Sequence, residues 1–138
     1  MVHTAEISLQ TKGHADMHDL TQAVADHVRR SGLSDGVVTV FCPSSTSALT
    51  TIEFEDGALA DLRRALDEIA PPDLDYKHNL RWGDGNGHAH LRAALLGPSL
   101  TIPFTKGGLR LGAWQQIVYI DFDNRPRRRA LVVQMIGE

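Results

Sequence analysis

The stretch SLTIPFTKGGLRLGAWQQIVYIDFDNRPRRRALVVQMI, residues 99–136, decides the class of fold. It contains three runs rich in β-branched, aromatic and other apolar residues, at positions 99–104, 113–122 and 130–136. A Lys106-Gly-Gly turn separates the first two runs, and an Asn124-Arg-Pro turn separates the last two. Short turns of this composition between such runs are typical of neighbouring antiparallel strands. We therefore expect these three strands to form an antiparallel meander.

Further strands are expected in the first half of the chain. Residues 4–11 alternate between apolar and polar side chains, as in a strand with one buried face. The runs at 37–41 and 48–54 predict two more strands, which lie on either side of the polar cluster Ser44-Ser-Thr-Ser.

Helices are expected between the strands. Apolar positions three and four residues apart predict a helix at 17–30, with Asp16 as its N-cap and Gly32 or Gly36 at its end. A second apolar stripe over 59–69 predicts a helix that Pro71-Pro72 stops. The expected fold class is α+β, a single domain over residues 1–138 with a mostly antiparallel sheet and helices packed on it.

Composition excludes several classes of protein. The 138 residues suffice for one domain with a core, and 42% hydrophobic with 22% charged residues is an ordinary globular composition. The net charge of −3 gives no reason to expect nucleic acid as a partner. The single cysteine, Cys42, excludes an intrachain disulfide and a cysteine-based zinc cluster. Without an apolar run of membrane-spanning length or a signal-like start, a cytoplasmic protein with no membrane partner is expected.

The segment with the strongest chemical signal is 76–98. His78, His88 and His90 are three of the seven histidines, and Asp84 lies among them on a backbone rich in glycine. Imidazoles and carboxylates are common zinc ligands, and imidazoles also transfer protons near neutral pH. This clustering predicts a site. The alternative is that His88 and His90 are exposed or capping helix residues and His78 is a hydrogen-bonded loop residue.

The expected helix at 87–96 separates the histidines. Asn86 is a suitable N-cap, and Gly97-Pro98 can end the helix. In a regular helix His88 and His90 diverge by roughly 200° around the axis. His90 facing His78 is therefore the preferred ligand pair, and His88 could join only from the loop or the first turn.

Other polar groups have a functional and a structural interpretation. Hydroxyls of the Ser44–Ser47 cluster could hold an anion, or only form a turn. Glu53 and Glu55 would share a face of a strand, either solvated or directed at a cation. The arginines at 125 and 127–129 could bind phosphate, or pair with Asp121, Asp123 or a neighbouring subunit. Trp114 could contact a ring-shaped substrate, or pack against neighbouring side chains of the fold.

Several segments, in the same order along the chain, resemble the YjbQ family. The matching elements are Thr11-Lys-Gly, Asp19-Leu-Thr, Gly36-Val-Val-Thr-Val-Phe, Thr46-Ser-Ala, His78-Asn79, Asp84-Gly-Asn-Gly-His-Ala-His-Leu, Leu95-Leu-Gly-Pro-Ser-Leu-Thr-Ile-Pro-Phe, Leu111-Gly-Ala-Trp-Gln-Gln-Ile-Val and Arg127-Arg-Arg to Gly137-Glu138. The resemblance covers nearly the whole chain. It implies a YjbQ-like α+β domain, assembled as a homotrimer, and a secondary thiamine-phosphate synthase activity. That reaction joins a pyrimidine-methyl diphosphate to a thiazole phosphate and releases pyrophosphate.

The resemblance also implies roles for residues of this chain. The catalytic residues would be His78, Asp84, His90 and Glu53. The resemblance is compatible with a divalent metal (zinc, magnesium or manganese), for which the histidine clustering offers His78, His88 and His90 as ligands, and no organic cofactor is expected. By resemblance, the small phosphorylated substrate would contact Thr46, Ser47 and Asn86. Trp114, Gln115 and Arg128 are further expected contacts; the family match assigns no role to the first two, and Arg128 comes from the basic run.

Two departures from the family pattern bear on these roles. Many members have histidine where this chain has Ser45, so a role of that histidine does not carry over. Many have Asn-Glu-Asn where this chain reads Ile52-Glu-Phe-Glu, which leaves Glu53 and Glu55 as alternative carboxylates. Three functions stay open: the transferase, a metal-dependent small-molecule hydrolase, and a non-catalytic trimeric protein that binds a metabolite or anion.

Overall fold

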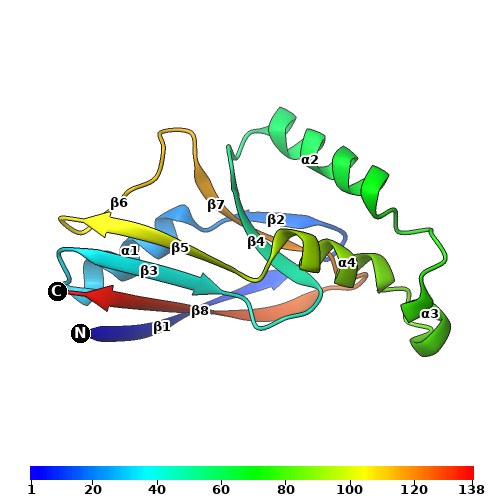
Figure 1. The fold of residues 1–138 in the computed structure, drawn as a ribbon, viewed down its shortest axis with the longest axis horizontal. Helices are drawn as coiled ribbons and strands as arrows, with labels where there is room; N and C mark the ends of the chain where they lie inside the picture. Colours follow the sequence, from blue (N-terminus) through cyan, green and yellow to red (C-terminus); the bar gives the residue numbers. More distant parts are fainter.

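Eight strands and four helices make up the fold in the computed structural model, which describes all residues from Met1 to Glu138. Figure 1 shows both chain termini at one end of the molecule and α3 at the opposite end. In chain order the elements are β1 (Val2–Thr11), β2 (Asp16–Asp19), α1 (Thr21–Ser31), β3 (Gly36–Phe41), β4 (Ser47–Ile52), α2 (Asp56–Ile69), α3 (Lys77–Trp82), α4 (Gly87–Leu96), β5 (Ser99–Thr105), β6 (Gly108–Leu109), β7 (Gln116–Asp121) and β8 (Arg127–Gly137).

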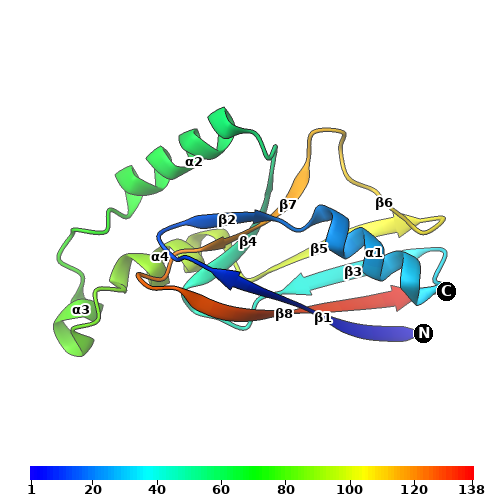
Figure 2. The same ribbon diagram turned by 180° about the vertical axis from the view of Figure 1, so that it is seen from behind.

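The larger sheet has five antiparallel strands in the order β1-β8-β3-β5-β6. In β8, Val133 pairs with Ala5 of β1 on one side and with Val40 of β3 on the other. Alternate residues of these strands enter the main core, where α1 contributes Val24 and Val28. Figure 2 shows α1 lying across this sheet. The expected α+β class with antiparallel sheets is confirmed.

The smaller sheet, in the order β2-β7-β4, explains why the expected meander is wrong. Its central strand β7 is buried on both faces: Ile117 and Tyr119 enter the main core, whereas Val118 and Ile120 enter a second core beneath α2 and α4. A strand with two apolar faces needs cover on both, and β7 has the main core on one face and the second core on the other. β7 therefore pairs with neither β5 nor β8. In the larger sheet, β3 lies between β5 and β8.

Two boundaries also differ from expectation. Residues 16–19 form β2, where Met17 pairs with Ile120 of β7, so the first helix begins only at Thr21. Asp16 is not its N-cap; its carboxylate accepts a hydrogen bond from the backbone N–H of Lys12 at 2.9 Å and lies 2.9 Å from His18 Nε2. The helix ends as expected at Gly32, whose φ of 74° is left-handed.

The helix α2 projects from the two sheets, as Figures 1 and 2 both show. Of its 14 residues only Leu66 is buried. Glu55 is the N-cap and accepts hydrogen bonds from the backbone N–H groups of Gly57 and Ala58. The expectation that Glu53 and Glu55 share a strand face is wrong, since β4 ends at Ile52. No helix of the protein is long and apolar enough to cross a membrane.

Candidate metal centre

Three predicted residues from α3, α4 and the turn between them converge at one point. The ring centroids of His78 and His90 are 4.3 Å apart, and their planes are tilted by 43°. His78 Nδ1 lies 3.3 Å from Asp84 Oδ1. One donor atom from each of the three residues lies within 4.8 Å of the other two. The preferred pair of histidines therefore does face each other, with Asp84 beside it.

The hairpin of α3 and α4 creates this geometry. α3 ends after six residues at Gly83, whose φ of 65° is left-handed. The Asn79 side chain then accepts a hydrogen bond from the backbone N–H of Gly87 at 2.9 Å. A Cβ on Gly87 would lie 2.4 Å from the Tyr76 Cβ, so only glycine permits this approach of the two helices. The backbone contacts thus place the two histidines together.

The three side chains form a candidate metal site. His78 Nδ1 is buried and has no hydrogen-bond partner; it lies near Asp84 without the geometry of a hydrogen bond. Ligand atoms of a tetrahedral zinc ion lie about 3.3 Å apart, given zinc–ligand distances of about 2.0–2.1 Å. The His78–Asp84 separation already has that value. A divalent cation would satisfy the orphaned nitrogen and the carboxylate together.

His88 does not belong to this group. It is 4% exposed and lines a separate cavity with Arg92. Burial, followed by the charge of Arg92, lowers the pKa of His88. As its helical position predicts, His88 diverges from His90. In the candidate donor group, the third residue beside His78 and His90 is Asp84 and not His88.

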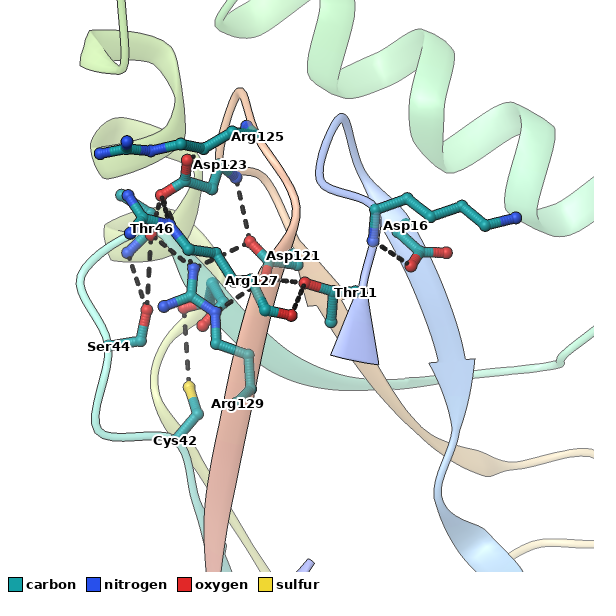
Figure 3. Close-up of polar contacts among 12 residues, drawn as sticks. Thr11, Asp16, Cys42, Ser44, Thr46, Asp121, Asp123, Arg125, Arg127 and Arg129 are labelled. Carbon is teal, nitrogen blue, oxygen red and sulfur yellow. Dashed lines mark hydrogen bonds and ion pairs between the residues drawn. The ribbon is translucent and has the colours of Figure 1, made fainter. Parts of the chain in front are cut away.

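A buried ion-pair network, drawn in Figure 3, is linked through Asn86 to Asp84 of the candidate centre. The Asp121 carboxylate is fully buried and accepts hydrogen bonds from Thr11 Oγ1 at 2.6 Å and from Arg129 Nε at 2.7 Å. Asp123, also buried, accepts hydrogen bonds from Arg127 Nε and Thr46 Oγ1, both at 3.1 Å. For Arg127 and Arg129, ion pairing with these aspartates is therefore the correct interpretation.

Asn86 connects the network to the candidate centre. Its side chain donates to Asp123 Oδ1 at 3.3 Å and accepts from the backbone N–H of Asn124 at 2.9 Å. Its own backbone N–H donates to Asp84 Oδ1 at 3.1 Å. Asn86 is buried and precedes α4 without capping it through its side chain. Its role in the structure is to fix Asp84 relative to the buried aspartates.

The other predicted site residues are dispersed. Thr46 is in the network, where its hydroxyl also accepts from Arg129, and the buried Ser47 hydroxyl has no partner. The exposed Arg128 borders a different cavity, beside Ser44 and Tyr119. None of these three residues contacts the histidine pair.

Glu53, Trp114 and Gln115 lie at the other end of β4 from Thr46. Gln115 donates to Thr51 near that end of the strand, and Trp114 is 76% exposed. Glu53 follows directly after β4, before α2, whereas His78 lies beyond the far end of this helix, which is about 20 Å long. Within one chain, Glu53 therefore does not join His78 and His90, and this part of the expected site is corrected.

Sequence reasoning assigned no site role to Asp121, Asp123 and Thr11. Their signal in the sequence is the alternation Asp121-Phe-Asp123 at the end of an apolar strand, followed by arginines two residues apart. Two carboxylates directly after a fully apolar strand suggest burial with cationic partners. The distant partner, Thr11, gives no such signal because it comes from the other end of the chain.

The Asp123 carboxyl leads to a prediction about acid stability. Burial alone would raise its pKa, but hydrogen bonds from Asn86, Thr46 and Arg127 outweigh burial and lower it. The ionised Asp123 carboxylate therefore stabilises the fold fully above its unfolded-state pKa of about 3.9. This contribution is lost as the pH falls through the folded-state pKa. We expect the free energy of unfolding, measured by urea titration, to fall below about pH 4 less steeply in Asp123→Asn than in the wild type. Equal slopes would contradict this account.

The chain matches the model of a protein family, described as "UPF0047 protein YjbQ-like", over residues 5–138. The chain belongs to the YjbQ family. A YjbQ relative from Methanothermobacter thermautotrophicus, a UPF0047 protein, is 37% identical over 99% of this chain and 94% of its own length. The UPF0047 protein YugU of Bacillus subtilis is 31% identical over 95% of this chain and 97% of its own length.

Solved structures of YjbQ proteins share the fold. A YbjQ-like protein of unknown function from Sulfolobus solfataricus P2 superposes with a TM-score of 0.95 at 33% identity, covering 100% of this chain and 99% of the other. An uncharacterised YjbQ/UPF0047 protein from Clostridium acetobutylicum gives a TM-score of 0.87 at 38% identity, covering 96% and 99%. The YjbQ fold is thus shared over nearly the full length, and these relatives carry no assigned activity.

Proposed function

We propose that the protein is a metal-dependent enzyme for a phosphorylated small molecule, with His78, Asp84 and His90 as ligands of one divalent cation. The observation that carries the proposal is the buried, unpartnered Nδ1 of His78, 3.3 Å from the Asp84 carboxylate. Three protein ligands leave a coordination position for water or substrate, as in catalytic rather than structural zinc sites. Two imidazoles and one carboxylate suit zinc or manganese better than magnesium, which prefers oxygen ligands.

The exposed face of α3 supports a substrate that is both anionic and aromatic. Arg81 and Trp82 follow His78 by three and four residues, so the three side chains share one side of the helix. The Arg81 guanidinium lies 5.5 Å from the Trp82 ring centroid, and Trp82 is 65% exposed. A guanidinium binds phosphate, and an exposed indole stacks on a planar ring.

A reaction of the thiamine-phosphate synthase type is the most specific form of this proposal. Its pyrimidine would stack on Trp82, and its diphosphate would reach Arg81. When bound, the cation would neutralise charge on the departing pyrophosphate. We also propose that the protein is a cytoplasmic homotrimer that needs no organic cofactor.

The test is turnover by the metal-stripped full-length protein, with and without added zinc or manganese. The substrates are the pyrimidine-methyl diphosphate and the thiazole phosphate, and both thiamine phosphate and pyrophosphate are measured. We expect product only with metal, and a loss of at least about 100-fold in His78→Ala. A His27→Ala variant, which removes a histidine of α1 outside the donor group, is the matched control.

Each outcome has a distinct meaning. Metal-dependent phosphate or pyrophosphate release without thiamine phosphate would replace the transferase with a hydrolase that uses the same centre. Metal binding without transferase or hydrolase turnover would leave a non-catalytic binding protein as the remaining function. Equal turnover in His78→Ala and the wild type would contradict the assignment of the centre.

A further inference from the structure

A second polar cavity, of about 150 Å³, lies between α2, α4 and the turn that joins β1 to β2. Figure 2 shows these three segments at the same end of the molecule. The charged and titratable side chains around it are those of His14, Arg63, Asp67, His88 and Arg92. None of them is a ligand of the candidate metal centre.

Arg92 provides a buried positive charge in the cavity wall. It is 4% exposed, and its guanidinium lies 5.7 Å from the Phe122 ring centroid. Its Nε donates to the Ala70 carbonyl and its Nη2 to Asp67 Oδ1, both at 2.9 Å. Nη1 takes part in neither bond. The Asp67 side chain is 62% exposed, so solvent weakens the attraction between its carboxylate and the buried Arg92 guanidinium.

The charge balance of the cavity favours an anion. Among the arginines and the acid that line it, Arg63 and Arg92 carry two positive charges against one negative charge on Asp67. Arg63 is held at the mouth by donating a hydrogen bond from Nη1 to the His14 carbonyl at 3.3 Å. His14 and His88 also line the cavity. An oxyanion accepts hydrogen bonds from guanidinium and imidazole N–H groups alike.

The backbone that carries His14 is held in an unusual conformation. Gly13, His14 and Ala15 have φ values of 75°, 53° and 65°. Non-glycine residues in this region cost on the order of 1–3 kcal/mol each and persist only where the surroundings enforce them. Here the N–H groups of His14 and Ala15 donate to the carbonyls of Asp123 and Asp121, both at 2.8 Å. The turn is therefore fastened rigidly beside the cavity.

We propose that this cavity binds one phosphate group, held by Arg63, Arg92 and the two histidines. Its volume lies below the range of about 300–1,000 Å³ typical of sites for larger ligands, so only the phosphate group itself fits inside. The group could be free inorganic phosphate or the phosphoryl end of a small metabolite. A bound phosphate would link α2 to α4, and α2 has only Leu66 buried against the body.

The test uses metal-stripped full-length protein, so that phosphate cannot bind through a cation at the histidine pair. Inorganic phosphate and glycerol phosphate are titrated separately by calorimetry at constant ionic strength. We expect saturable binding of inorganic phosphate, weakened at least about tenfold in Arg63→Gln. The matched control is Arg64→Gln, the same change one position along α2. Arg64 lies outside the cavity and pairs with Asp61 at 3.7 Å, so its loss should change affinity less than about twofold.

Hydrogen exchange of α2 provides the second readout. We expect phosphate to slow exchange across Asp56–Ile69 in the wild type and in Arg64→Gln, but not in Arg63→Gln. Binding of glycerol phosphate as well would identify a phosphoryl group of a metabolite as an occupant; binding of inorganic phosphate alone would identify the free ion. Absence of saturable binding up to about 10 mM, or equal weakening in both arginine variants, would overturn the proposal.

Discussion

Replacing His90 with alanine is expected to lower the affinity for zinc at least about 100-fold, because altering even the partners of metal ligands typically costs about 10–100-fold. His90 lies across from His78, with ring centroids 4.3 Å apart, and its loss would leave only His78 and Asp84 as donors. The wild type should bind about one divalent ion per chain. The measurement is competition with a chelator of known affinity, together with the metal content of the purified protein.

Two further variants make the metal experiment specific. Asp84→Asn removes the charged ligand while the side-chain oxygen can still accept the hydrogen bond from the Asn86 backbone, so the hairpin should persist while affinity falls. His27→Ala removes a histidine from α1, outside the donor group, and should leave the affinity unchanged. Affinities of His90→Ala and the wild type that agree within error would rule out this centre.

Replacing Arg129 with alanine is expected to destabilise the fold by about 3–5 kcal/mol, because it leaves a buried carboxylate without its cation. Arg129 donates to both oxygens of Asp121, at 2.7 and 3.0 Å, and also to the hydroxyl of Thr46. The Asp121 side chain is fully buried, and that of Arg129 is only 16% exposed. The measurement is urea unfolding at neutral pH, followed by circular dichroism.

The neighbouring arginine provides the control for this prediction. Arg128 is exposed and belongs to the same strand, so Arg128→Ala should change stability by no more than about 0.5 kcal/mol. Adding Asp121→Asn to Arg129→Ala should recover part of the loss, since the remaining group is then neutral. Similar unfolding free energies for Arg128→Ala and Arg129→Ala would show that the ion pair contributes little.

The arrangement of the candidate site could be predicted from sequence only where its residues are close along the chain. The glycine-rich segment contains the whole hairpin, so the pairing of His78 with His90 follows from a helix that begins at Gly87. The divergence of His88 follows from the same periodicity. Glu53 was placed wrongly because its position depends on where β4 ends and in which direction α2 continues. The residues next to Glu53 in the sequence indicate neither.

The amino-acid sequence by itself determined the class of fold, the main helices and most strands, and the histidine pair, because periodicity, turn residues and short spacings act over a few residues. The tertiary structure alone decided that β7 leaves its chain neighbours for a second sheet, since both of its faces require a core. It also decided which charges are buried together: Thr11 reaches Asp121 across 110 positions of the chain. Likewise, α2, α4 and the β1–β2 turn enclose the arginine-lined cavity only after packing. Contacts of this kind arise from burial and the pairing of distant elements, which no local pattern encodes.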